Sequence, residues 1–211
     1  NIIQGELFMK KLFLMFMLLT PFAIADERAE IFISPSYGSY RGQKKNDINQ
    51  EVKNVIGSGV KISFERRQPF IDDSGAGIGT GIVYNALKVK GNGIKSSSGS
   101  LISVPLYMTL GTGLDNGIYT KVLFGLAFSN GNVKWTDKNG GHGEIKAAPI
   151  NGYGGIGIGV QKDKFSVGIS AVTAPRLKRS YSSPTKKYRD KISDGLISLE
   201  FGYNPNSNKQ K

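Results

Sequence analysis

Residues 102–128, ISVPLYMTLGTGLDNGIYTKVLFGLAF, contain two apolar runs on either side of a short turn. In both runs apolar residues alternate with small or polar ones, and LDNG at 114–117 separates the runs. A period of two is the side-chain period of a β-strand, and Asp-Asn-Gly between two such runs is typical of a hairpin. The stretch therefore predicts two antiparallel strands with one apolar face and one small or polar face.

The same alternation recurs along most of the chain and predicts eight strands. They lie near 30–41, 53–67, 75–90, 100–113, 117–131, 148–161, 164–175 and 190–204. Most of them reach the ~9–11 residues that a tilted strand needs to cross a bilayer. The links between them alternate in length. Four long links are expected outside the cell, at 42–52, 91–99, 132–147 and 176–189, and three short turns inside, at 68–74, 114–117 and 162–163.

The chemistry of the two strand faces indicates which side meets lipid. One face is rich in Ile, Val, Leu and Phe, and the other carries mainly glycine, serine and a few charges. Exposed strands of glycine and serine would be a poor water-facing surface, because these residues form strands weakly. With the apolar face toward lipid, small and paired polar groups fill a narrow lumen. The sequence thus predicts an all-β fold, an eight-stranded antiparallel up-and-down transmembrane β-barrel.

The beginning of the chain has the pattern of an export signal. Met9, Lys10 and Lys11 precede an apolar stretch at 12–25 that ends in Ala-Ile-Ala, a small-x-small cleavage pattern. We therefore expect upstream residues at 1–8, a cleaved signal peptide at 9–25, a barrel at 26–204 and a polar tail at 205–211. The chain contains no cysteine, so the exported barrel is expected to form without disulfides.

The middle hairpin VPLYMTLGTGLDNGIYTKVLFGLAF and the final GLISLEFGY resemble the OmpA/OmpX-like family of small outer-membrane β-barrels. The resemblance covers residues 26–204, without a periplasmic domain. It implies a monomer in the bacterial outer membrane, among lipids that include lipopolysaccharide. It also implies recognition of a terminal aromatic residue by the barrel-assembly machinery, and the matching aromatics here are Phe201 and Tyr203.

Four charged residues lie on the lumen face of the predicted strands: Lys61, Glu65, Lys121 and Glu200. Charges inside apolar strands are costly unless they are paired. We interpret the four as a structural charge network, and a gated proton or ion path is the alternative.

The basic residues give the main functional clue, because the chain has a formal net charge of +12. The predicted outer loop at 175–191 holds seven cations against one aspartate. They are Arg176, Lys178, Arg179, Lys186, Lys187, Arg189 and Lys191. Such a loop suits anionic partners, namely lipopolysaccharide or sulfated host glycans. No specific nucleic-acid partner is expected, and a solvated loop without a ligand is the alternative.

Other motifs give weak signals for chemistry. GYGGIG at 152–157 matches a dinucleotide fingerprint, but the sequence after it predicts another hairpin instead of the required helix. His142 is the only histidine, and no Gly-x-Ser-x-Gly turn supports a triad with Ser96, Ser97 or Ser98. We therefore expect no enzyme, metal or cofactor. The alternatives are an outer-membrane lipid-modifying enzyme and a secreted soluble barrel that binds a small apolar ligand.

Several aromatic residues fall near predicted strand ends, where membrane barrels carry girdles at the lipid interface. These are Tyr84, Tyr119, Phe128, Trp135, Tyr153, Phe165 and Tyr203.

Overall fold

The computed structural model describes residues 29–41, 54–71, 74–91, 93–113, 117–138, 140–182, 187–192 and 195–205. At 39–41, 54, 69–71, 181 and 187–192 only the backbone is described. The upstream residues, the signal peptide at 9–25 and residues 206–211 of the polar tail lie outside the described residues. Their assignments stay predictions.

Eight strands form a closed antiparallel ring, which confirms the predicted fold class. They are β1 (Ala29–Arg41), β2 (Asn54–Ile71), β3 (Ser74–Lys90), β4 (Ile94–Thr112), β5 (Gly117–Asp137), β7 (Ile150–Lys162), β8 (Phe165–Thr173) and β11 (Gly195–Tyr203). Each strand pairs with the next in this order, and β11 pairs with β1 to close the ring. Closure removes the unpaired strand edges that a bilayer does not tolerate. No helix among the described residues is long and apolar enough to cross a membrane.

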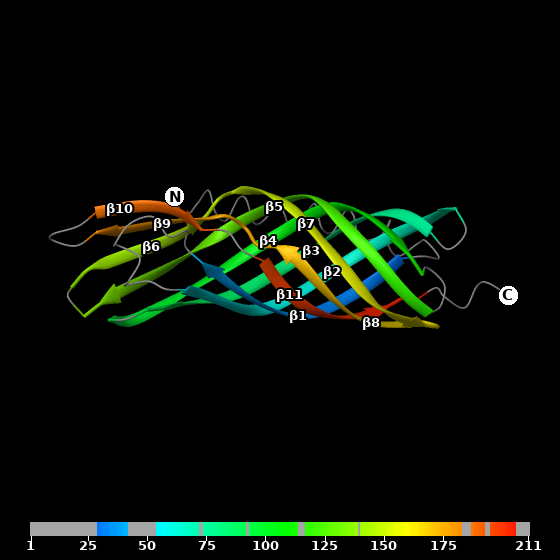
Figure 1. Ribbon diagram of the computed structural model, residues 1–211, viewed down its shortest axis with the longest axis horizontal. Helices are drawn as coiled ribbons and strands as arrows, with labels where there is room; N and C mark the ends of the chain where they lie inside the picture. The colour runs from blue at the N-terminus through cyan, green and yellow to red at the C-terminus, as the bar shows by residue number, and fades with distance from the viewer. Residues whose placement is uncertain are drawn as a thin grey trace.

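Three further strands extend the sheet beyond the ring, at one end of the elongated molecule (Figure 1). They are β6 (His142–Ala147), β9 (Leu177–Ser182) and β10 (Lys187–Ile192). The outer part of β5 pairs with β6, β6 pairs with β9, and β9 pairs with β10. We call this part the outer sheet.

The outer sheet corrects the prediction of long loops at 132–147 and 176–189. Strand β5 continues to Asp137 and returns as β6, and much of the basic segment is a hairpin of β9 and β10. The predicted link at 91–99 is also shorter, because β4 begins at Ile94. These segments pair edge to edge, so their backbone hydrogen bonds are made within a sheet that continues beyond the apolar belt.

The face assignment is correct: the apolar side chains point outward and form a belt around the ring. Ile156 is 65% exposed and Phe165 is 64% exposed, as expected of lipid-facing residues. Leu106 and Phe124, from the stretch that decides the fold, are also on the outside. The apolar residues are therefore arranged inside out relative to a water-soluble barrel.

Large inward side chains are accommodated where glycines lie opposite them on the neighbouring strand. The Tyr107 ring lies so close to Gly79 that a Cβ atom at residue 79 would overlap it. Tyr107 is held in place from its other side by Tyr153, with ring centroids 5.2 Å apart. Lumen-facing glycine in these strands thus provides the space that interior rings occupy.

The pairing of β7 with β8 ends before the outer sheet begins, which leaves a gap between the two ladders. The ladder stops at Gly155 opposite Val172, and the β6–β9 ladder begins at Ala147 opposite Leu177. Seven residues, 148–154, therefore face four residues, 173–176. Side chains bridge this gap: Gly154 N donates to Thr173 Oγ1 at 3.0 Å, and Arg176 N donates to Asn151 Oδ1 at 2.8 Å.

Candidate functional site

Six charged side chains form one chain of alternating sign inside the barrel. In order of contact they are Lys61, Glu200, Lys121, Glu65, Arg67 and Glu30. Lys121 is at the centre, with its Nζ 2.8 Å from Glu200 Oε2 and 3.0 Å from Glu65 Oε1. Three positive and three negative groups give this chain no formal net charge.

The two charges at the ends of this ionic chain, Lys61 and Glu30, are also paired. Lys61 Nζ is 2.9 Å from Glu200 Oε1, and Arg67 lies 2.6 Å from Glu30 Oε2. Tyr107 donates a further hydrogen bond of 3.0 Å to Glu65 Oε1. Because each charge is buried, removing one partner would leave a costly unpaired charge behind. The arrangement suits a structural network that fills the lumen.

The structure brings together the four predicted lumen residues, Lys61, Glu65, Lys121 and Glu200. Sequence reasoning missed Glu30 and Arg67. The signal for Arg67 was present, since it lies two residues after Glu65 on β2 and so shares its face. Glu30 is directly opposite Glu65 on β1.

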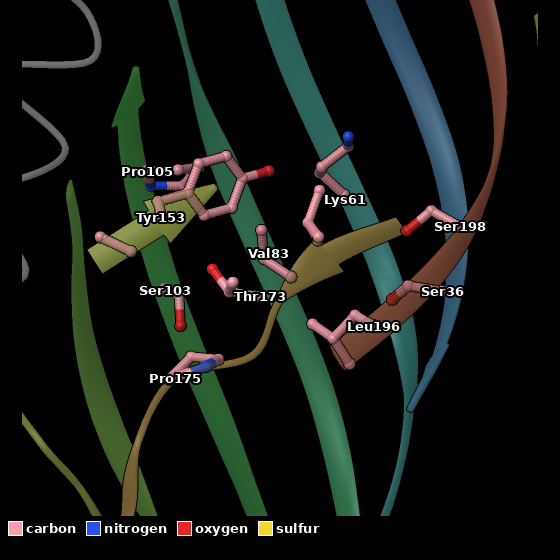
Figure 2. A pocket seen from close by; sticks show the side chains of 12 residues that line it. Ser36, Lys61, Val83, Ser103, Pro105, Tyr153, Thr173, Pro175, Leu196 and Ser198 are labelled. Carbon is pink, nitrogen blue, oxygen red and sulfur yellow. The ribbon is translucent and has the colours of Figure 1, made fainter. Parts of the chain in front are cut away.

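A small cavity lies beside the Lys61 end of the ionic chain (Figure 2). Its lining includes Lys61, Val83, Tyr153, Val172 and Leu196, and its volume is about 20 Å³. That is room for about one water molecule, far below the ~300–1,000 Å³ of small-molecule sites. The cavity is a packing gap in a filled lumen, and it is too small to serve as a binding pocket.

The end of the barrel that carries the outer sheet has an apolar interior. Its buried cluster includes Val55, Leu87, Val89, Leu101, Val133, Trp135, Ile145, Leu177 and Leu196. Sequence reasoning placed Trp135, Tyr119 and Tyr153 in a lipid-facing girdle, and this was wrong. Trp135 is 2% exposed and packs in this cluster, and the rings of Tyr119 and Tyr153 are buried in the lumen. Tyr84, Phe165 and Tyr203 do face outward, as predicted, and Phe128 is half-buried.

The outward face of the outer sheet carries a row of cations in register. Lys146 on β6 is directly opposite Lys178 on β9, and the backbone of Lys191 on β10 is opposite Lys178. Lys146 and Lys178 are both exposed. Side chains directly opposite each other have Cβ atoms ~4.5–5.5 Å apart, and like charges there are destabilising. We call Lys146 and Lys178 the lysine row.

One carboxylate lies next to the lysine row. Glu144 Oε2 is 3.0 Å from Lys146 Nζ, and Glu144 Oε1 accepts a 3.0 Å hydrogen bond from Asn132. Burial alone would raise the pKa of Glu144, but the hydrogen bonds from Lys146 and Asn132 outweigh it and hold this pKa below its ordinary value. Lys178 has no ion pair within the described part of the chain.

The structure separates the predicted anion-binding residues into three groups. Arg176 and Lys178 are exposed, as an anion site requires. Arg179 is 2% exposed and lies on the inward face of β9, as Leu177 does. The prediction that Arg179 belongs to an exposed anion site was therefore wrong. Lys186 lies outside the described residues, and the side chains of Lys187, Arg189 and Lys191 are not described. Alternation along β9 explains the burial of Arg179, because even-numbered residues of this strand point outward.

The weak catalytic motifs do not assemble. Ser96 is opposite Thr136, and His142 is on the far side of Thr136. Two strand spacings separate the Ser96 and His142 backbones by roughly 9–10 Å, and Ser96 Oγ is instead 2.9 Å from Thr136 Oγ1. Residues 152–157 run within β7 and are followed by β8 instead of a helix. Across the described ranges, no group of three or more His, Asp or Glu side chains could hold a metal ion.

Comparison with known proteins supports the fold. No family model and no curated protein matches the sequence. Among solved structures, the outer membrane protein OprG from Pseudomonas aeruginosa is similar, with a TM-score of 0.52 and 12% sequence identity over 83% of this chain and 94% of that chain. Ail, the attachment invasion locus protein of Yersinia pestis, aligns with a TM-score of 0.49 and 11% identity over 84% of this chain and 99% of that chain. At such low identity, the likeness to OprG establishes that this chain has the fold of a small outer-membrane β-barrel.

Proposed function

We propose that this chain is a monomeric, non-enzymatic β-barrel of the bacterial outer membrane that acts at the cell surface by binding anionic groups. The outward apolar belt supports the membrane location, because lipid is the environment that such a belt requires. The predicted signal peptide and the terminal aromatics Phe201 and Tyr203 are consistent with export and assembly by the usual barrel machinery.

The observation that carries the surface role is the lysine row on the outer sheet. Cations aligned across neighbouring strands repel one another, so a negatively charged partner relieves repulsion that the fold itself leaves in place. Lys134 and Arg176, also exposed, add to the positive field on this end of the molecule. Lipopolysaccharide and sulfated host glycans are the candidate partners, because both present dense anionic groups at the cell surface.

Binding to a sulfated polysaccharide at increasing salt tests this function. The purified barrel in a neutral detergent should bind immobilised heparin at low salt and release it as salt rises, because exposed charges are screened over ~8 Å at physiological ionic strength. An uncharged polysaccharide of similar size is the control. Absence of heparin and lipopolysaccharide binding at low salt would contradict a role in anion binding.

A further inference from the structure

The lysine row lies just above the apolar belt. Ile150 is an outward apolar residue at the start of β7 and is 59% exposed. Lys146 precedes it by four residues, which is at most about 13 Å along the chain at ~3.3 Å per residue. A strand tilt of ~35–45° lowers the height above the belt to roughly 10 Å. At no more than this height, the row lies within or just above the headgroup region, which extends ~5–8 Å beyond the hydrocarbon core on each side.

We propose that Lys146 and Lys178 together bind a phosphate monoester on the saccharide headgroup of an outer-leaflet glycolipid. This inference rests on the proposed function and names the ligand of the same site. A phosphate oxygen between the two ammonium groups would neutralise a pair that the strand register forces together. Arg176 is exposed two residues before Lys178 and adds a planar donor for the same headgroup.

Glu144 is an internal competitor in this site. Its Oε2 atom lies 3.0 Å from Lys146 Nζ, the position that a phosphate oxygen would take. Asn132 holds the other carboxylate oxygen at 3.0 Å, so the side chain is fixed beside the row. A ligand must therefore displace Glu144 from Lys146, whereas Lys178 has no ion pair to displace among the described residues. Replacing Glu144 by an uncharged isostere should strengthen binding, and replacing the lysines should weaken it.

The test compares a phosphorylated glycolipid with its dephosphorylated form, each titrated into the purified full-length barrel in neutral nanodiscs. The double variant Lys146→Gln/Lys178→Gln should lower affinity for the phosphorylated form by about tenfold, because it removes two exposed ion pairs with the phosphate. Glu144→Gln should raise affinity by about two- to fivefold on the same scale. Lys162→Gln/Lys164→Gln, at the turn between β7 and β8, removes the same charge from the opposite end and should have no effect.

The outcomes separate this inference from the proposed function. Equal binding of the two glycolipid forms, or equal affinity of the two double-lysine variants, would overturn the phosphate site. If the barrel still binds heparin in a salt-dependent way in that case, the proposed function stands and other basic residues carry it. If it binds neither heparin nor the phosphorylated glycolipid, both proposals fail. Unchanged gel mobility of unheated samples would show that each variant is folded.

Discussion

Glu200 joins two cations of the lumen network, because its carboxylate contacts both Lys61 and Lys121. Glu200→Gln keeps the shape of the side chain but leaves these two buried ammonium groups with too little negative charge. We expect the free energy of unfolding to fall by about 3–5 kcal/mol. Thermal unfolding in detergent measures the loss. Glu144→Gln removes an ion-paired carboxylate from the surface and should leave stability nearly unchanged, and equal losses in the two variants would contradict the buried network.

Glu144 also makes a prediction about pH. Its pKa lies below the ordinary value of 4.5, so it is charged and paired with Lys146 at neutral pH and releases Lys146 only as the pH falls through this lowered value. Heparin affinity, measured with sulfate groups that stay charged, should therefore rise below pH ~4.5. The rise at the lower pH should be missing in Glu144→Gln, and its persistence there would assign it to another group.

At the scale of the strand, period two predicted the ring but not the outer sheet. Apolar alternation in 102–128 and its repeats gave the correct strands and faces, since burial on one side sets that pattern. In β9 the outward positions carry lysine and serine instead of apolar residues, so the sequence of this segment looked like a loop. Alternation along β5 would have placed Trp135 correctly. The inward residues of this strand are odd-numbered, as Lys121 and Val133 are, so a longer strand puts Trp135 inside the barrel. The strand predicted from the sequence ended at residue 131, so Trp135 was taken to lie beyond it.

Strand β4 passes from lipid to water, and this predicts a contrast between two positions on its outward face. Leu106 is in the apolar belt, and Ser98 is outward and exposed on the same strand, opposite Lys134. Leu106→Arg should cost about 2–4 kcal/mol and reduce assembly into membranes, as a charge near the bilayer centre does. Ser98→Arg should assemble normally. The folded fraction of each variant, read from heat-modifiable mobility after extraction, checks the contrast, and equal assembly of both variants would disprove a lipid-facing belt.

In the whole molecule, the two halves of the barrel lumen are filled by side chains of different chemistry. Alternating charges fill the half near the short turns, and an apolar cluster fills the half under the outer sheet. Strand spacing in sequence could not predict this division, because it depends on which residues of distant strands meet across the lumen. The ionic chain connects strands β1, β2, β5 and β11. Its members are up to 170 residues apart in the sequence, the separation between Glu30 and Glu200.

In the proposed orientation, the apolar belt lies in the outer membrane and the outer sheet is exposed to the cell exterior. The absence of native cysteine allows a direct measurement: single cysteines at Lys146, Phe124 and Lys162 are reacted with a membrane-impermeant maleimide on intact cells. This orientation predicts labelling at residue 146, on the outer sheet, and protection at residue 124, in the belt. It also predicts that residue 162, at the opposite end, is labelled only after the outer membrane is permeabilised. Labelling of residue 162 but not residue 146 on intact cells would reverse the orientation, and ready labelling of residue 124 would contradict the membrane barrel itself.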